Sequence, residues 1–451
     1  MRRYIIIGSG AAGLSAAEAI CGRDPQASIQ IITDDPYGYY SRPGLAYYLA
    51  GEVPQDALYP YTEAYYRSLH LHILKEGVSR INPAEHTVHL SGGRILPYDR
   101  LLIATGATAS LPDTPGVKLE GVVTFDSMLD TLHIMKLAKR ASAAVVIGGG
   151  ITALELVEGF KIQGARTHYF LRGDRYWSNV LDETESRMVE DRLKEDGIIL
   201  HFHARAAEIV GKKNKVEAVR TEDGALLPCQ LVGIAIGIRP RKELAQVSGL
   251  AVKRGILVND HQMTSNPDIF SAGDVAQVID PLHPDGLLES LWNPAQLQGT
   301  VAGLNMAGLT TPLCRPMAVN VTRLAGLVTT IIGQVGEGEV KGKQDSDTNS
   351  IMRGDSEEWE EVPNAVVAET HGGHNRLRLY IGDRTIIGAL LMGDQSLSRP
   401  LQNMIERQID IRDLRSRMLG PDARLKEIIL DCWNSLPYLR APKNPYAPKI
   451  A

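Results

Sequence analysis

The stretch YIIIGSGAAGLSAAEAI, residues 4–20, decides the fold of this chain. Its apolar start predicts a buried strand, and the alanine-rich run after Gly10 predicts a helix. The turn between them reads GxGxxG, in which Gly8 permits a tight turn, Gly10 lets a pyrophosphate approach the backbone, and Gly13 lets helix and strand pack closely. The free N–H groups near Ala11 and Ala12 would face the phosphates. With the β-rich run at 28–32, the segment predicts a βαβ unit that binds a dinucleotide.

Two carboxylates stand where the second strand of this unit ends. Asp34 and Asp35 follow Thr33, and either could accept hydrogen bonds from a ribose. Asp-Asp-Pro is also good turn chemistry, so a purely structural role stays open.

A second copy of the pattern runs from residue 143 to residue 171. A strand-like run at 143–147 leads into GGGITALELVEGF (148–160) and then THYFL (167–171). Further strands are expected near 231–236 and 269–270. Two such openings predict an α/β fold with two Rossmann-like, parallel-sheet domains.

Composition narrows the class of protein. The chain has 451 residues, enough for two or three domains, and a net charge of -5, which gives no general attraction to nucleic acid or anionic membranes. No secretory leader or bilayer-length apolar run is recognisable, so we expect a cytoplasmic protein without a membrane span. The cysteines show no metal-ligand spacing, so no metal site is predicted. They are Cys21, Cys229, Cys314 and Cys432.

The last third of the chain has a different character. Residues 336–364 are polar and acidic, which predicts a solvated or partly disordered loop. Residues 376–393 predict a β-hairpin turning at Gly382 and Asp383, followed by a helix from about Pro400. The proline-rich end, 436–451, is expected to be extended.

Two further motifs carry a family resemblance. LIATGA (102–107) and SAGD (271–274), in order with the two glycine turns, resemble signatures of the FAD-dependent pyridine nucleotide-disulphide oxidoreductase superfamily. The resemblance implies a FAD domain at 1–110 and 235–315 and an inserted NAD(P) domain at 111–234. Residues 316–451 would form a C-terminal α+β domain of the type used for dimerisation, so a homo-oligomer is expected.

The resemblance also implies the residues around FAD. Asp274 would hydrogen-bond the ribityl chain of the flavin, and Arg42 would meet the pyrophosphate. The helix beginning at Leu291 and Trp292 would cover the pyrimidine end of the flavin. Trp292 could equally be a core residue beside the start of that helix. The remaining residues assigned to FAD are Pro43, Val78, Ala104, Thr105, Gly106 and Gly273.

For the nicotinamide dinucleotide, the resemblance implies Gly148, Gly150, Ile151, Thr152 and Gly237. Leu171 stands where NAD-specific members carry an acidic residue. Arg172 and Arg175 follow, and an arginine fork can bind a 2′-phosphate, so we favour NADPH over NADH. Glu155 is the one candidate catalytic residue, with a helix-surface carboxylate as the alternative.

The route by which electrons leave also follows from the resemblance. Disulfide reductases carry CxxxxC on the first helix, where this chain has only Cys21, and single-cysteine relatives carry their thiol where this chain has Pro43. A thiol relay is therefore not expected. PYGYYSRPGLAYYLAG (36–51) resembles rubredoxin and ferredoxin reductases and the flavin end of the nitrite reductase large subunit. The expected function is electron transfer from NAD(P)H through FAD to a rubredoxin or ferredoxin. The alternatives are an electron-transfer subunit with a weakened nicotinamide site, and an NAD(P)H oxidase.

Overall fold

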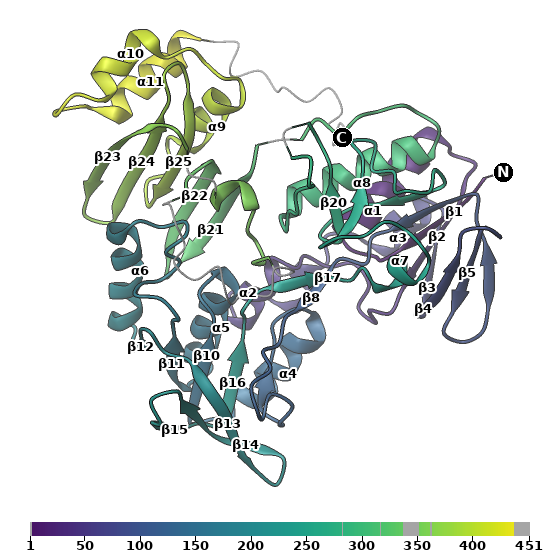
Figure 1. Cartoon of the computed structure of the whole chain (residues 1–451), viewed down its shortest axis with the longest axis horizontal. Coiled ribbons are helices and arrows are strands. Elements are labelled where there is room, and N and C mark those ends of the chain that lie inside the picture. The colour runs from purple at the N-terminus through teal and green to yellow at the C-terminus, as the bar shows by residue number, and fades with distance from the viewer. Residues whose placement is uncertain (1, 282, 316, 337–350, 361–362, 437–451) are drawn as a thin grey trace. The chain divides into compact units, whose positions relative to one another are not determined.

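The computed structural model describes residues 2–281, 283–315, 317–336, 351–360 and 363–436 (Figure 1). The chain divides into two compact units. The first comprises Met1–Trp177, Glu190–Arg315 and Lys341–Glu357, and the second comprises Ser178–Val189, Pro316–Val340 and Glu358–Ala451.

The first unit contains a five-stranded parallel sheet in the order β19-β7-β1-β2-β3. Its strands are β1 (Arg3–Ile7), β2 (Ser28–Thr33), β3 (Leu71–Lys75), β7 (Arg100–Ile103) and β19 (Ile269–Ser271). Residues 4–7 of β1 are all buried, as expected for a central strand covered on both faces. The predicted strand–turn–helix–strand opening is confirmed.

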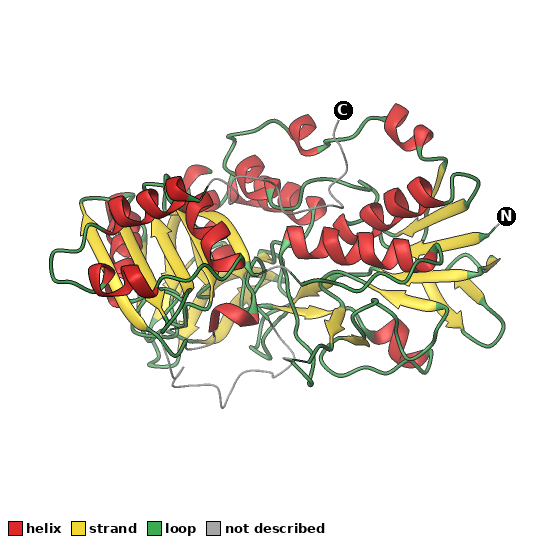
Figure 2. Ribbon diagram, turned by 90° about the horizontal axis from the view of Figure 1, so that it is seen from above, coloured by secondary structure: helices red, strands yellow, loops and turns green. Residues whose placement is uncertain are grey.

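Helices α1 (Ala11–Arg23) and α8 (Trp292–Met306) lie side by side on this sheet (Figures 1 and 2). A Cβ added to Gly299 or Gly303 would overlap the carbonyl groups of Ala12 and Ala16 respectively. The missing side chains therefore let the helix axes approach closely. This contact brings the start of α8 towards the glycine turn after β1.

The second parallel sheet of the first unit has the order β12-β11-β10-β16-β9. Its strands are β9 (Val122–Val123), β10 (Ala143–Ile147), β11 (Arg166–Phe170), β12 (Ile199–His201) and β16 (Leu231–Ile234), with helices α4 (Met128–Ala138) and α5 (Ile151–Ile162). The predicted α/β class with two Rossmann-like sheets is confirmed. Because both sheets belong to one compact unit, the domain limits near 110 and 235 stay predictions.

Shorter elements complete this unit and the link to the second. The strands are β4 (Val78–Asn82), β5 (Thr87–Leu90), β6 (Ile95–Pro97), β8 (Ala107–Ala109), β13 (Ala206–Lys212), β14 (Lys215–Thr221), β15 (Leu226–Pro228), β17 (Ile238–Pro240), β18 (Ile256–Val258) and β20 (Ala276–Val278). The helices are α2 (Gly44–Leu49), η1 (Gln55–Leu58), α3 (Glu63–Ser68), α6 (Glu183–Glu195), α7 (Glu243–Val247) and η2 (Glu357–Glu360). The antiparallel pair β8-β17 matters for the site, because it carries Gly237 at its edge.

The second unit is built on a five-stranded antiparallel sheet, β21-β22-β25-β24-β23. Its elements are β21 (Val319–Leu324), β22 (Leu327–Gly333), β23 (Val366–Gly372), β24 (Asn375–Ile381), β25 (Ile386–Met392), α9 (Ser398–Glu406), α10 (Arg412–Met418) and α11 (Leu425–Ser435). The predicted hairpin is confirmed as β24 and β25, with the Gly382 N–H donating to the carbonyl of Thr385 at 2.9 Å. The helix expected near Pro400 is α9. Most of the proline-rich end, 437–451, lies outside the described residues.

A buried group of charges belongs to this second unit. Arg378 is 1% exposed and lies 3.0 Å from the fully buried carboxylate of Glu185, while it also donates to the carbonyl of Val180 at 2.7 Å. Arg376 donates to Asp182 at 2.6 Å. Each of these buried guanidinium groups therefore has a carboxylate partner within the unit.

The prediction of a solvated loop at 336–364 is wrong for residues 351–360. Ile351 forms an antiparallel bridge with Ile238, and Trp359 is fully buried with its Nε1–H donating to the carbonyl of Ala318 at 3.2 Å. The segment is acidic on average, so its composition does not indicate that these apolar side chains become buried. They pack in hydrophobic cores when the chain folds. Residues 337–350 and 361–362 lie outside the described residues.

Candidate functional site

The first glycine turn joins β1 to α1. Gly8 has φ +113°, and a Cβ there would overlap the carbonyl oxygen of Ala104, so only glycine fits. A Cβ on Gly13 would in turn overlap the carbonyl of Gly8. These two glycines are required by packing alone, as the sequence predicted.

Gly10 differs, because, apart from its neighbours in the chain, no atom of the described residues lies within 4 Å of a Cβ placed on it. It is the N-cap of α1, and no side chain caps the helix there. The first N–H groups of α1, near Ala11 and Ala12, have no hydrogen-bond partner within the helix. They lie next to the open space at Gly10. An open cradle at a helix N-terminus fits a pyrophosphate.

The Ala104–Gly106 turn lies beneath this cradle. The Ala104 N–H donates to the carbonyl of Ile7 at 2.8 Å, which fixes the turn at the carboxyl end of the sheet. The Thr105 hydroxyl donates to the carbonyl of Arg241 at 3.0 Å. The turn thereby links β7 to the segment after β17.

The two candidate ribose carboxylates have different surroundings. Asp35 accepts hydrogen bonds from the Tyr37 N–H at 2.9 Å and from the Tyr40 hydroxyl at 3.0 Å, so it is already used in the turn. Asp34 is exposed. Nearby, the Ser9 hydroxyl donates to Thr33 at 3.0 Å and ties the glycine turn to the end of β2. Ribose binding by either aspartate stays a prediction.

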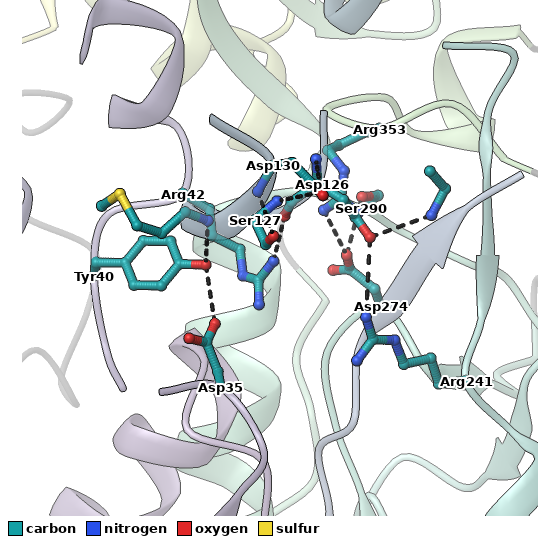
Figure 3. Close-up of polar contacts among 12 residues, drawn as sticks. Asp35, Tyr40, Arg42, Asp126, Ser127, Asp130, Arg241, Asp274, Ser290 and Arg353 are labelled. Carbon is teal, nitrogen blue, oxygen red and sulfur yellow. Dashed lines mark hydrogen bonds and ion pairs between the residues drawn. The ribbon is translucent and has the colours of Figure 1, made fainter. Parts of the chain in front are cut away.

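Asp126 is the centre of a charged network that the sequence did not reveal (Figure 3). It is 7% exposed; its carboxylate accepts from the Ala109 N–H at 3.2 Å and is ion-paired with Arg353, while Arg241 lies 3.9 Å away. Its carbonyl oxygen accepts from Arg42 Nη1 at 2.7 Å. Three cations thus converge on one residue just before α4.

The predicted ribityl-binding aspartate, Asp274, lies at the other side of this network (Figure 3). Arg353 Nη1 lies 3.7 Å from its carboxylate, and the Ser290 hydroxyl donates to it at 3.2 Å. Burial raises the pKa of the Asp274 carboxyl, although Arg353 and Arg42 favour the ionised form. Gly273 is held by its N–H bond to Gln298 of α8 at 2.8 Å.

Arg42 keeps its charge in a confined place. Burial lowers the pKa of Arg42, because it disfavours the charged guanidinium. Its neighbours have the opposite effect, Tyr40 and Asp126 most strongly, and the net result is a raised pKa. The guanidinium lies 5.6 Å from the centre of the Tyr40 ring. A fixed cation in the same charged network as Asp274 suits a phosphate group.

The remaining residues assigned to FAD are dispersed around this centre. Leu291 is the buried N-cap of α8, and Trp292 begins that helix with its ring centroid 6.0 Å from that of Tyr39. Pro43 is the exposed N-cap of α2. Val78 begins β4, where it pairs with Leu90, and no described contact links it to the network.

The second glycine turn has the same backbone plan as the first. A Cβ on Gly148 would overlap the carbonyl of Ala235, and Gly150 is the N-cap of α5 without a capping side chain. Ile151 and Thr152 form the first turn of that helix. The difference is at Gly150, where a Cβ would overlap the terminal methyl group of Met352.

The other nicotinamide candidates lie around α5 and β11. Glu155 is partly buried in α5 and acts electrostatically on Tyr176. Leu171 is 1% exposed, Arg172 is exposed, and Arg175 is paired with Asp174 at 3.6 Å. Gly237, with φ +119°, links β16 to β17. These positions leave Arg172 the more accessible of the two arginines.

No cysteine takes a place expected of a redox thiol. Cys21 packs partly buried in the core between α1 and the first sheet, and burial raises the pKa of its thiol. Burial raises the pKa of Cys229 to about 12. A neutral thiol is a poor nucleophile.

Residues 126, 352 and 353 were not among the predicted site residues. Asp126 precedes the capping box formed by Ser127 and Asp130, which signals a helix start but no ligand. Met352 and Arg353 stand in the acidic segment, where no periodic pattern marks them. Their proximity to the site arises only on folding.

Among the described residues, no helix is both long and apolar enough to cross a bilayer. Within that same part of the chain, no group of three or more histidine, cysteine, aspartate and glutamate side chains is placed to hold a metal ion.

Comparison with known proteins agrees with this geometry. Residues 2–299 match the family described as pyridine nucleotide-disulphide oxidoreductase. The chain is 28% identical to the nitrite reductase [NAD(P)H] of Bacillus subtilis (strain 168), over 91% of this chain and 48% of that protein. It is 30% identical to the biphenyl dioxygenase system ferredoxin–NAD(+) reductase component of Paraburkholderia xenovorans, over 79% of this chain and 85% of that protein. The chain thus spans about half the length of the first relative and most of the second.

The fold has a close counterpart in a crystal structure of the covalent putidaredoxin reductase–putidaredoxin complex. The TM-score is 0.81 at 23% identity, covering 95% of this chain and 98% of that chain. At this identity the likeness concerns the fold.

Proposed function

Because the chain belongs to the pyridine nucleotide-disulphide oxidoreductase family, we propose that it takes electrons from NAD(P)H through FAD and delivers them to a small electron-carrier protein. Rubredoxin or ferredoxin is the class of carrier proposed. The observation that carries the proposal is the pair of glycine turns in one compact unit, with Arg42 and Asp274 in one charged network beside them.

FAD would be held by the first turn. The open cradle at Gly10 and the guanidinium of Arg42 suit its pyrophosphate, and Asp274 offers a carboxylate to a ribityl hydroxyl. When bound, the flavin supplies the chemistry of accepting a hydride and releasing electrons singly. The protein's own part is to orient it and exclude water.

NADPH is proposed in preference to NADH. The exposed guanidinium of Arg172 follows the buried Leu171, so the position where an acidic residue would be expected holds an apolar side chain with a cation directly after it. A 2′-phosphate would pair with that cation, whereas a carboxylate would repel it. Glu155 is proposed to act where the nicotinamide meets the flavin.

Direct transfer to the acceptor is proposed because no thiolate is available in the places where a redox thiol is expected. Pro43 occupies the place where a redox cysteine would be expected, and burial keeps the thiol of Cys21 neutral. An electron-carrier partner needs only an exposed flavin edge and a docking surface. The ferredoxin reductase relative supports this class of partner.

The test is anaerobic mixing of the FAD-loaded protein with NADPH or NADH, followed by the flavin absorbance. Bleaching by either dinucleotide is expected, with the lower half-saturating concentration for NADPH. In a second, aerobic assay with rubredoxin or ferredoxin added, reduction of the carrier protein should be faster than oxygen consumption; faster oxygen consumption would favour an NAD(P)H oxidase instead. Absence of bleaching with both dinucleotides would refute the proposal.

The role of Glu155 can be tested in the same assay. Glu155→Gln should slow flavin reduction, while Glu158→Gln, one turn along α5, serves as the matched control. Equal rates for both variants would leave Glu155 as a helix-surface carboxylate.

A second candidate is an electron-transfer subunit whose nicotinamide site has weakened. Met352 lying over Gly150 favours it, as does the missing acid at Leu171. It predicts a flavin that exchanges electrons with a partner protein and is not bleached by NADPH or NADH.

A further inference from the structure

Residues Ile351–Glu357, here called the strap, are part of the first unit although they follow the first two strands of the second unit in sequence. At its start the strap extends the β8-β17 pair. The Ile351 N–H donates to the carbonyl of Ile238 at 2.9 Å, and the Ile238 N–H donates back at 2.7 Å. Ile351 also packs in a small buried cluster with Ala107, Ile238 and Leu288.

The far end of the strap is fixed just before α8. The Gly354 N–H donates to the carbonyl of Ser290 at 3.1 Å, and the Ser290 N–H donates to the carbonyl of Asp355 at 3.2 Å. Glu357 pairs with Arg254 and accepts from the Leu288 N–H at 3.2 Å. The strap therefore connects the segment after Gly237 to the segment before Leu291.

Between these anchors, two side chains reach the predicted cofactor residues. Arg353 lies between Asp126 and Asp274 (Figure 3). Met352 extends towards the second glycine turn, and its terminal methyl group stands where a Cβ on Gly150 would project.

The two glycine turns are therefore unequal. Gly10 faces open space, whereas the matching space at Gly150 is filled by a thioether methyl group. In a GxGxx turn the second glycine lacks a side chain so that a pyrophosphate can reach the backbone. A pyrophosphate and the Met352 methyl group cannot share that space.

We propose that Met352 determines the affinity of the second dinucleotide site, because a dinucleotide binds there only after the Met352 side chain has left Gly150. The inference rests on the proposed binding of NAD(P)H at this turn. The anchors at Ile351 and Gly354 can stay in place, since methionine has three rotatable bonds and can move alone.

Binding of NADP+ and NAD+ to the FAD-loaded protein tests this proposal without turnover. Met352→Ala should lower the dissociation constant by about tenfold, equivalent to about 1.4 kcal/mol, because no side chain need be displaced. Met352→Phe should raise it, since a stiffer and larger group leaves the turn less easily. Met263→Ala, a partly buried methionine packed against the core of the first sheet, is the matched control and should bind as the parent protein does.

A spectroscopic readout accompanies the titration. With methionine methyl groups labelled with ¹³C, the resonance that disappears in Met352→Ala should shift on adding NADP+, and that of Met263 should not. An unshifted Met352 resonance at saturating NADP+ would overturn the inference.

The two proposals fail in different ways. If NADPH or NADH bleaches the flavin while Met352→Ala binds no more tightly, only the role of Met352 is refuted. If neither the parent protein nor Met352→Ala binds NADP+ or NAD+, Met352 is not what limits binding, and the proposed nicotinamide site fails as well.

Discussion

Replacing Gly10 by alanine should separate binding of FAD from stability of the fold. Gly10 has φ −79°, which any residue adopts, and beyond its chain neighbours a Cβ there meets no atom within 4 Å in the part of the chain that the structure describes. Alanine restricts the unfolded chain, which stabilises by about 0.4–1 kcal/mol. It is a poorer N-cap than glycine by roughly the same amount. The stability of the apoprotein should therefore change by less than about 1 kcal/mol.

FAD should nevertheless bind much more weakly to Gly10→Ala. The added methyl group would stand in the cradle at the start of α1 and hold the pyrophosphate away from the helix N–H groups. A hydrogen bond to a charged group contributes about 1.5–3 kcal/mol. Loss of one such bond raises the dissociation constant about 10- to 100-fold.

The assay measures FAD binding to the apoprotein by calorimetry and apoprotein stability by chemical denaturation. Gly22→Ala is the matched control, because it lies near the other end of α1 and also meets no atom within 4 Å. It should leave the FAD affinity unchanged. Parent-like FAD affinity in Gly10→Ala would refute the assignment of the first turn to the pyrophosphate. Loss of apoprotein stability by several kcal/mol would refute the claim that the cradle is open.

Three further outcomes are expected. Arg378→Met should destabilise the second unit by about 3–5 kcal/mol, because a buried carboxylate loses its partner, whereas exposed Arg412→Met should leave stability nearly unchanged in the same denaturation experiment. With its pKa raised to about 12, Cys229 stays protonated at pH 8, so mass spectrometry after iodoacetamide treatment should find exposed Cys314 alkylated and Cys229 unmodified. Arg172→Glu should weaken NADP+ binding at least tenfold and leave NAD+ binding within about threefold; equal losses would show that Arg172 does not contact the 2′-phosphate.

The sequence by itself determined the features that depend on local backbone requirements. Gly8 and Gly13 are recognisable because a strand, a sharp turn and a helix in immediate succession leave no room for a Cβ. The buried run at 4–7 and the hairpin turn at Gly382 are likewise properties of a few neighbouring residues. Order along the chain then sufficed to indicate two dinucleotide-binding sheets.

Only the tertiary structure decided which charged side chains meet. Asp126, Arg353 and Asp274 come from segments far apart in the sequence, and an ion pair imposes no periodicity on the residues around it. From the sequence, Asp35 is either a ribose ligand or a turn residue, and only the structure shows that its carboxylate accepts a hydrogen bond from Tyr40.

The strap is the clearest case of contacts that the sequence could not predict. Its acidic surroundings predict a solvated segment, because average composition takes no account of contacts with distant parts of the chain. Ile351 and Met352 acquire partners only when β17 and the second glycine turn are already folded. The sequence therefore predicts where a dinucleotide could bind, and the packing of a distant segment decides which side chain lies against the second of those places.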